Sequence, residues 1–207
     1  MLELIKKLVD LQGSPVLYAE PCTAESLQRN WLIKNSQWRA EQGSFIGSNP
    51  GNHPGMIVSR ADYPGDVFLD FQARTVPPST HDIDWMWNGS WDETTNQRGP
   101  AYVAGLEGWW VGKVGFERSP DYRLNVATKL FPFEPGRWYR IQSGSIGGHV
   151  FVVVDGRLVL EVTDPDPLDG ARYAKVGFEA YASTIQLRAI QIRRPCWQPI
   201  ERAYPAD

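Results

Sequence analysis

Cysteine and histidine are both scarce in this sequence, and their scarcity excludes several kinds of site. The 207 residues include 2 cysteines, Cys22 and Cys196, and 3 histidines. Two cysteines are too few for a disulfide framework or for a cysteine-rich structural zinc site. No histidine, cysteine or acid lies at the tight spacing of a metal site. We therefore expect no metal and no cofactor.

The sequence also lacks a surplus of positive charge and a long hydrophobic run. Its formal net charge is -3 and its pI is near 5.7, which argues against a general nucleic-acid binder. No apolar run approaches the roughly 20 residues that span a bilayer. The opening "MLELIKKLVDLQG" is interrupted by charges and lacks the features of a secretion signal. These absences predict a cytoplasmic protein that binds neither nucleic acid nor a membrane.

Helical periodicity is rare, whereas strand-like runs cover most of the chain from residue 30 onward. Only 1–11 and 23–30 suggest helix, the second with Thr23 as its N-cap. Short strands alternate with Gly, Pro and Asn turns, and Asp155-Gly156 is a typical hairpin turn. The pattern predicts an all-β, two-sheet antiparallel sandwich of jelly-roll type with a short N-terminal helix. We expect one domain of 1–207, with an extension (1–29), a sandwich core (30–194) and a C-terminal tail (195–207).

Tryptophan is unusually abundant, and it gathers in one part of the sequence. Five of the 9 tryptophans fall between residues 85 and 110, next to carboxylates and glycines. Large aromatic side chains fill the cores of sandwiches, and they also stack against sugar rings. Both interpretations stand at this point. Trp91, Trp109 and Trp110 are the candidates for a stacking surface.

The stretch "HDIDWMWNGSWDE" (81–93) begins as a strand with two different faces. Alternation places Ile83, Trp85 and Trp87 on an apolar face directed at the core. The opposite face carries the acids Asp82 and Asp84, followed by Met86 and Asn88. A buried carboxylate without partners is costly, so this face should meet water or a cation. We expect Asp82 and Asp84 to act in catalysis and Asn88 to bind substrate.

A second polar group lies around "GLEGWWVGKVGFERSPDYR" (105–123). Its acids and arginines are Glu107, Glu117, Arg118 and Arg123, and glycines stand at 105, 108, 112 and 115. Forked arginine donors suit a carboxylate or neighbouring hydroxyls, whereas ordinary surface charge is the alternative. We take Glu107 as a catalytic candidate, and Arg118 and Arg123 as substrate-binding candidates. His81 is the best candidate for a general base, although a lone histidine is more often an ordinary polar residue.

Several segments resemble known sandwich proteins. "WRAEQGSFIGS", "GMIVSRADYPGDVFLDFQAR" and "KVGFEAYASTIQLRAIQIRR" resemble the domains that act on 3-keto-glycosides. "AGLEGWWVGKVGFERSPDY" is similar to the YesU-like proteins found among enzymes for pectin-derived sugars. Both groups belong to the concanavalin A-like lectin/glucanase superfamily, and the resemblance covers roughly residues 30–194. It implies that first and last strands pair, which would make the thiols of Cys22 and Cys196 neighbours.

The superfamily's retaining glucanases offer a catalytic template, Glu-x-Asp-x-x-Glu, which this chain matches only in part. Asp82 and Asp84 stand at the first two acids, but Trp87 occupies the position of the last acid. Retaining hydrolysis needs two carboxyls about 5–5.5 Å apart, so this departure argues against a glucanase.

The expected function is therefore a class of activity rather than one substrate and one reaction. The sequence predicts a carbohydrate-active protein that binds a small saccharide, a modified disaccharide or pectin-type oligosaccharide, on a concave sheet face. If it is an enzyme, it is a glycoside hydrolase or lyase. A non-catalytic sugar-binding module and a structural or interaction sandwich are the alternatives, and the sequence leaves a homodimer open.

Overall fold

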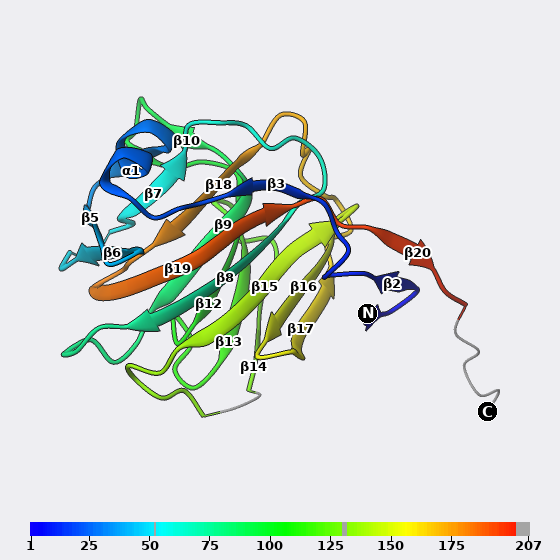
Figure 1. The fold of residues 1–207 in the computed structure, drawn as a ribbon. Helices are drawn as coiled ribbons and strands as arrows, with labels where there is room; N and C mark the ends of the chain where they lie inside the picture. The colour runs from blue at the N-terminus through cyan, green and yellow to red at the C-terminus, as the bar shows by residue number, and fades with distance from the viewer. Residues whose placement is uncertain (52, 130–131, 202–207) are drawn as a thin grey trace.

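Two large antiparallel sheets pack face to face in the computed structural model, which describes residues 1–51, 53–129 and 132–201 (Figure 1). The eight-stranded sheet has the order β17 (Arg157–Thr163), β16 (His149–Val154), β15 (Tyr139–Ile146), β8 (Phe68–Thr75), β19 (Ser183–Arg193), β6 (Ser44–Asn49) and β5 (Gln37–Glu41), and β3 (Val16–Ala19) also pairs with β19. The seven-stranded sheet has the order β14 (Asn125–Thr128), β13 (Val114–Ser119), β12 (Ala101–Leu106), β9 (Ile83–Gly89), β18 (Lys175–Glu179), β7 (Met56–Ser59) and β4 (Trp31–Lys34). The predicted all-β sandwich is confirmed.

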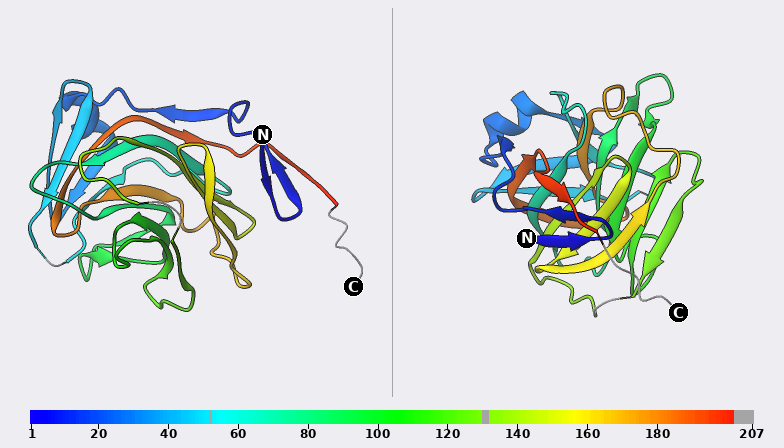
Figure 2. Two further views of the ribbon diagram at one scale, coloured as in Figure 1. Left: turned by 90° about the horizontal axis from the view of Figure 1, so that it is seen from below. Right: turned by 90° about the vertical axis from the view of Figure 1, so that its right-hand side faces the viewer.

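Smaller elements complete the fold at its edges. A three-stranded sheet joins β1 (Leu2–Leu4), β2 (Lys7–Val9) and β20 (Trp197–Pro199), so the first strands of the chain pair with its last strand (Figures 1 and 2). A short hairpin consists of β10 (Trp91–Asp92) and β11 (Gln97–Arg98). The described helix is α1 (Ala24–Asn30). Among the described residues, no helix has the length and apolar character needed to cross a bilayer.

The core lies between the two sheets, and strand alternation builds it. On β9, Ile83, Trp85 and Trp87 are fully buried in the core, as the sequence predicts, and the Trp85 ring packs against Phe71. The indole N–H of Trp87 donates to Ser145 Oγ at 3.0 Å, so this buried polar group is satisfied. Alternation then directs Asp84 and Met86 to the outer face of the seven-stranded sheet.

Two local predictions are confirmed by the backbone. Thr23 caps α1 through a hydrogen bond from the Ser26 N–H at 3.0 Å, and the Ser26 hydroxyl accepts from the Thr23 N–H. Asp155 and Gly156 turn between β16 and β17 with φ angles of 49° and 78°. Positive φ at both positions is the requirement of the tight turns that join right-twisted strands.

The helix predicted over residues 1–11 is wrong. The segment is a hairpin in which Lys6, with a φ of 61°, lies in the turn between β1 and β2. Leu4 and Val9 pack with Phe68 and Phe151 on the outer face of the eight-stranded sheet. The burial of this apolar surface outweighs the helical spacing of a short segment, for which isolated helix formation is marginal.

The predicted neighbourhood of the two thiols is also wrong. Strand β3 runs antiparallel to β19, with Ala19 opposite Gln191 and Val16 opposite Arg193. Cys22 follows β3 and Cys196 follows β19, so the antiparallel strands carry them to opposite ends. Cys22 is buried, Cys196 is exposed, and both are free.

Candidate functional site

A pocket of about 460 Å³ opens on the outer face of the seven-stranded sheet. Four acids, one arginine, a histidine and three aromatic side chains line most of it. The lining residues are Pro54, His81, Asp82, Asp84, Arg98, Gly108, Trp109, Glu117, Tyr122, Glu179, Tyr181 and Ala182. This composition combines a stacking surface with a small number of polar groups, as sugar and cofactor sites do.

The strand register places Asp84 at the centre of the pocket floor. Its neighbour on β18 is Glu179, and its neighbour on β12 is Gly105. The next residue in this row, on β13, is Gly115. Two acids directly opposite each other on one sheet face destabilise the fold. Such a pair persists in a fold when it is neutralised by a proton, a cation or a ligand.

The two glycines beside Asp84 make room for the ring of Trp109. A Cβ atom on Gly105 would lie 1.9 Å from Asp84 Oδ1 and 3.3 Å from the Trp109 ring. A Cβ atom on Gly115 would lie 2.8 Å from the same ring. The indole therefore lies directly on the backbone of β12 and β13, next to the carboxyl of Asp84.

Arg98 is the one cationic side chain among the pocket residues of the described chain. The β10–β11 hairpin delivers it, and its side chain is only 9% exposed. It donates to Glu117 Oε1 at 2.8 Å, to Glu179 through Nη1, and to Ser119 Oγ at 3.2 Å. One guanidinium thus faces the carboxyls of β9, β13 and β18, so acids outnumber cations.

Asp82 and Asp84 form a second pair, without a cation of their own. They are 4% and 5% exposed, and the Oδ1 atom of each has no hydrogen-bond partner within the described chain. Burial raises the pKa of Asp82 to about 7, with Glu179 raising it further and the contact with Asp84 lowering it. Burial, followed by the charge of Asp82, raises the pKa of Asp84 well above its ordinary value. Both shifts favour the protonated form of these carboxyls, so the pair can hold a proton at a pH where exposed carboxyls are ionised.

The expectation that the acids of this face meet water or a cation is therefore wrong as regards water. Asp84 lies at the pocket floor, but its side chain is buried. The two acids that hold Arg98 are buried as well, and burial raises the pKa of Glu117 and of Glu179, which Arg98 partly offsets.

The three candidate stacking tryptophans have different surroundings. Trp109 lines the pocket, and its N–H donates to Asn125 Oδ1 at 3.2 Å. Trp110 donates to the same Asn125 atom but is 39% exposed, outside the pocket lining. Trp91 packs on Met56, Met86 and their apolar neighbours on the same sheet face, with Lys34 over its ring. His81 lies exposed at the pocket, where its Nδ1 is 3.4 Å from Thr80 Oγ1.

Asn88 does not share the face of Asp84, contrary to the prediction from alternation. Strand β9 has one extra residue there, because Gly177 pairs with Met86 whereas Lys175 pairs with Gly89. Asn88 adopts a φ of 41° at this bulge. Its side chain turns into the sandwich and accepts from Ser145 Oγ at 3.1 Å.

Glu107 also lies outside the pocket lining. Its φ is 51°, and its carboxylate accepts from the Gly112 N–H at 2.8 Å. The side chain thus closes the turn of 107–113. This turn carries Gly108 and Trp109, so Glu107 holds the shape of a loop that lines the pocket without reaching it.

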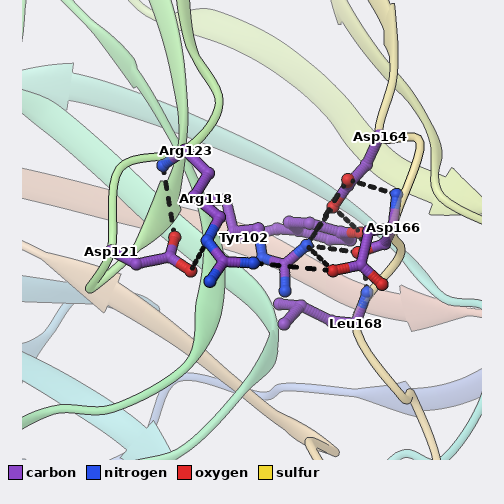
Figure 3. Close-up of polar contacts among 7 residues, drawn as sticks. All are labelled: Tyr102, Arg118, Asp121, Arg123, Asp164, Asp166 and Leu168. Carbon is purple, nitrogen blue, oxygen red and sulfur yellow. Dashed lines mark hydrogen bonds and ion pairs between the residues drawn. The ribbon is translucent and has the colours of Figure 1, made fainter.

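Arg118 and Arg123 lie in another cluster (Figure 3). The guanidinium of Arg118 contacts Asp164 Oδ2 at 3.2 Å and the backbone carbonyl of Asp166. Arg123 is exposed and pairs with Asp121 at 3.2 Å. Strand alternation explains the separation: Arg118 follows the core residue Phe116 by two positions and therefore shares its face of β13. These arginines tie the 164–168 loop to β12 and β13, away from the pocket.

Sequence reasoning missed Arg98, Glu179, Tyr122 and Tyr181 in this pocket. Alternation could have found Glu179, because Phe178 beside it is an obvious core residue. It could also have separated Glu117 from Arg118. Arg98 carries no periodic signal, since it comes from a hairpin of two-residue strands.

The chemistry of the pocket is that of hydrogen-bond acceptance and proton transfer. Outside residues 52, 130–131 and 202–207, no group of three or more His, Cys, Asp or Glu side chains is placed to hold a metal ion. The carboxyls can accept hydrogen bonds from a ligand's hydroxyl or amino groups. The Asp82–Asp84 pair can also give and take a proton.

Comparison with known proteins identifies the architecture. No family model matches the sequence, and no curated protein matches it. A Bacillus subtilis protein of unknown function with a galectin-like fold has a TM-score of 0.70 and 14% identity, over 91% of this chain and 99% of that chain. The carbohydrate-binding module CBM66 from Bacillus subtilis has a TM-score of 0.62 and 14% identity, over 80% and 96%. The carbohydrate recognition domain of Emp46p, in a potassium-bound form, has a TM-score of 0.59 and 11% identity, over 85% and 96%. At these identities the likeness shows the fold alone, a β-sandwich of galectin-like architecture.

Proposed function

We propose that the pocket binds a saccharide, with the ring of one sugar against Trp109 and its hydroxyls donating to Asp82 and Asp84. The observation that carries the proposal is that Asp82 and Asp84 line the pocket beside the Trp109 indole, while the Oδ1 atom of each has no hydrogen-bond donor among the described residues. Sugars present several donors around a partly apolar ring, and this arrangement matches both features. Two proteins of the same fold, a carbohydrate-binding module and a carbohydrate recognition domain, agree with this proposal.

The charge of the pocket narrows the class of saccharide. Acids outnumber the single arginine, and three donors of that arginine are already bound to protein atoms. A uronate would place another carboxylate among these acids, where like charges repel. The ligand is therefore a neutral or amino sugar rather than the pectin-type uronate that the sequence resemblance implies.

Calorimetric titration with neutral, amino and uronic disaccharides tests this proposal. Trp109→Ala should weaken binding by at least about tenfold, since an aromatic contact and its buried area are lost. Trp110→Ala is the matched control, because both indoles donate to Asn125 but only Trp109 lines the pocket. Equal losses of sugar affinity in the two folded variants, or a wild type that binds none of the sugars, would exclude the pocket as a saccharide site.

Glycosidic bond cleavage is the second candidate function, and the pKa of Asp82 favours it. A carboxyl with a pKa of about 7 beside a second acid is suited to general acid and base catalysis. Glu179, directly opposite Asp84, supplies the third carboxyl that β9 lacks at Trp87. Neutral 3-keto-disaccharides are the first substrates to test, because several segments of the sequence resemble the domains that act on 3-keto-glycosides. Turnover without a cofactor that falls as the pH rises above about 7 would support this candidate.

A further inference from the structure

A square of four side chains marks the outer face of the eight-stranded sheet, on the side opposite the pocket. In the register of β8 and β19, Arg74 lies opposite Gln186, and Gln72 lies opposite Arg188. Each arginine donates its Nε–H to the glutamine across from it, at 2.9 Å for Arg74 and 2.7 Å for Arg188. The two guanidiniums therefore occupy diagonal corners, where positions on neighbouring strands are about 7–8 Å apart.

Trp138, just before β15, fixes both guanidiniums in place. The centroid of its ring lies 4.0 Å from Arg188 Cζ and 4.8 Å from Arg74 Cζ. Cation–π stacking and the Nε hydrogen bonds restrict the rotamers of both arginines. Binding a ligand therefore costs less side-chain entropy here than at mobile surface arginines.

Neither of these arginines has a carboxylate partner within the described chain, although their neighbours do. Arg140 pairs with Asp70 at 2.9 Å, and Arg137 pairs with Asp155 at 2.8 Å. Arg74 and Arg188 each donate a hydrogen bond from Nε to a glutamine, and their Nη groups have no protein acceptor among the described residues. Two oriented, uncompensated cations thus stand on one open sheet face, in a protein whose net charge is -3.

We infer that this face binds a carboxylate-bearing polysaccharide, such as a polyuronate, with one carboxylate at each of Arg74 and Arg188. The planar fork of a guanidinium matches a carboxylate. An open sheet face can hold an extended chain, whereas small-molecule sites are concave. Arg74 and Arg188 occupy diagonal positions on neighbouring strands, and two cations so close favour a ligand with repeated negative charges. The acidic pI argues against nucleic acid as that ligand. This second site is opposite in charge to the pocket and independent of it.

Affinity electrophoresis in gels containing polygalacturonate, with a neutral galactan as the control polymer, tests the inference. At low salt we expect the wild type to be retarded by polygalacturonate alone, and Arg74→Gln/Arg188→Gln to bind at least about tenfold more weakly. The matched control is Arg172→Gln, because Arg172 also lies over an aromatic ring, 5.2 Å from the centroid of Tyr173, and pairs with no acid in the described part of the chain. Arg172→Gln should change the affinity for polygalacturonate, measured as retardation in the gel, by less than about twofold.

A conservative variant separates recognition from general charge and from misfolding. Arg74→Lys/Arg188→Lys keeps both charges but loses the forks, and it should bind more weakly than the wild type and more tightly than the glutamine variant. The inference is overturned if the wild type ignores polygalacturonate, if Arg172→Gln loses as much binding, or if single-stranded DNA binds more tightly than polygalacturonate. Sugar titration at the pocket should be unchanged in both double variants, so this result is independent of the saccharide proposal.

Discussion

Removing Arg98 should destabilise the protein strongly at alkaline pH and only slightly at acid pH. Arg98→Met leaves Glu117 and Glu179 in place, 5% and 2% exposed, without their shared cation. Removing one partner of a buried ion pair costs roughly 3–5 kcal/mol, unless the abandoned carboxyl takes up a proton. From an ordinary glutamate pKa of 4.5, protonation costs about 5 kcal/mol at about pH 8 but only about 0.7 kcal/mol at about pH 5.

Urea denaturation of the variant and the wild type at both pH values measures this difference. The loss in free energy of unfolding should shrink by at least about 2 kcal/mol between about pH 8 and about pH 5. Arg29→Met is the control, because its exposed pair with Glu25 contributes at most about 0.5 kcal/mol at either pH. A loss that is equal at both pH values, or no larger than that of Arg29→Met, would refute the reasoning.

Three further predictions follow from the same contacts. Burial raises the pKa of Asp82 to about 7, so its folded-state proton stabilises the protein at low pH, and this contribution is lost as the pH rises through about 7. The difference in free energy of unfolding between Asp82→Asn and the wild type should therefore shift by about 3 kcal/mol in favour of the variant from about pH 5 to about pH 8. Urea denaturation that shows the same difference at both pH values would contradict this. Gly105→Ala should displace the Asp84 side chain, because the new Cβ would lie 1.9 Å from Asp84 Oδ1. Calorimetric titration should then show weaker sugar binding, and an undiminished affinity for the sugar would disprove the close packing. Ellman's reagent should label Cys196 in the native protein and Cys22 only after unfolding, since burial raises the pKa of Cys22 to about 12; rapid labelling of both would disagree with the structure.

Alternation along the central strands was enough to predict which aromatic side chains form the core. Trp85 and Trp87 lie inside because β9 keeps a strict period of two from Ile83 to Trp87. The same period placed Asp84 on the outer face. Asn88 breaks the pattern because a single extra residue reverses the faces, and no feature of "WMWNGSW" distinguishes a bulge from a regular strand.

The composition of the pocket was less predictable, because it depends on contacts between distant strands. Asp84 and Glu179 lie 95 positions apart in the sequence and become neighbours through the order β9–β18. Arg98 reaches them from a hairpin that follows no hydrophobic period. Closeness in sequence groups Glu107, Arg118 and Arg123, but adjacent strand residues point to opposite faces and turns redirect side chains.

The N-terminal segment shows a different limit. Leu2, Ile5 and Val9 repeat at helical spacing, yet residues 1–11 form a hairpin. The deciding contacts are with Phe68, Ile146 and Phe151, and the pairing of β2 with β20 joins the segment to the far end of the chain. Local sequence contains neither contact, so tertiary burial overrides the local pattern.

A crystal structure with the neutral or amino disaccharide that binds best in titration tests the central claim most directly. We predict one sugar ring against Trp109, with its hydroxyl or amino groups within hydrogen-bond distance of Asp82 or Asp84. Tyr122 and Tyr181 should lie beside the same sugar, because both line the pocket. A sugar bound elsewhere on the sandwich, with this pocket left to solvent, would contradict the claim.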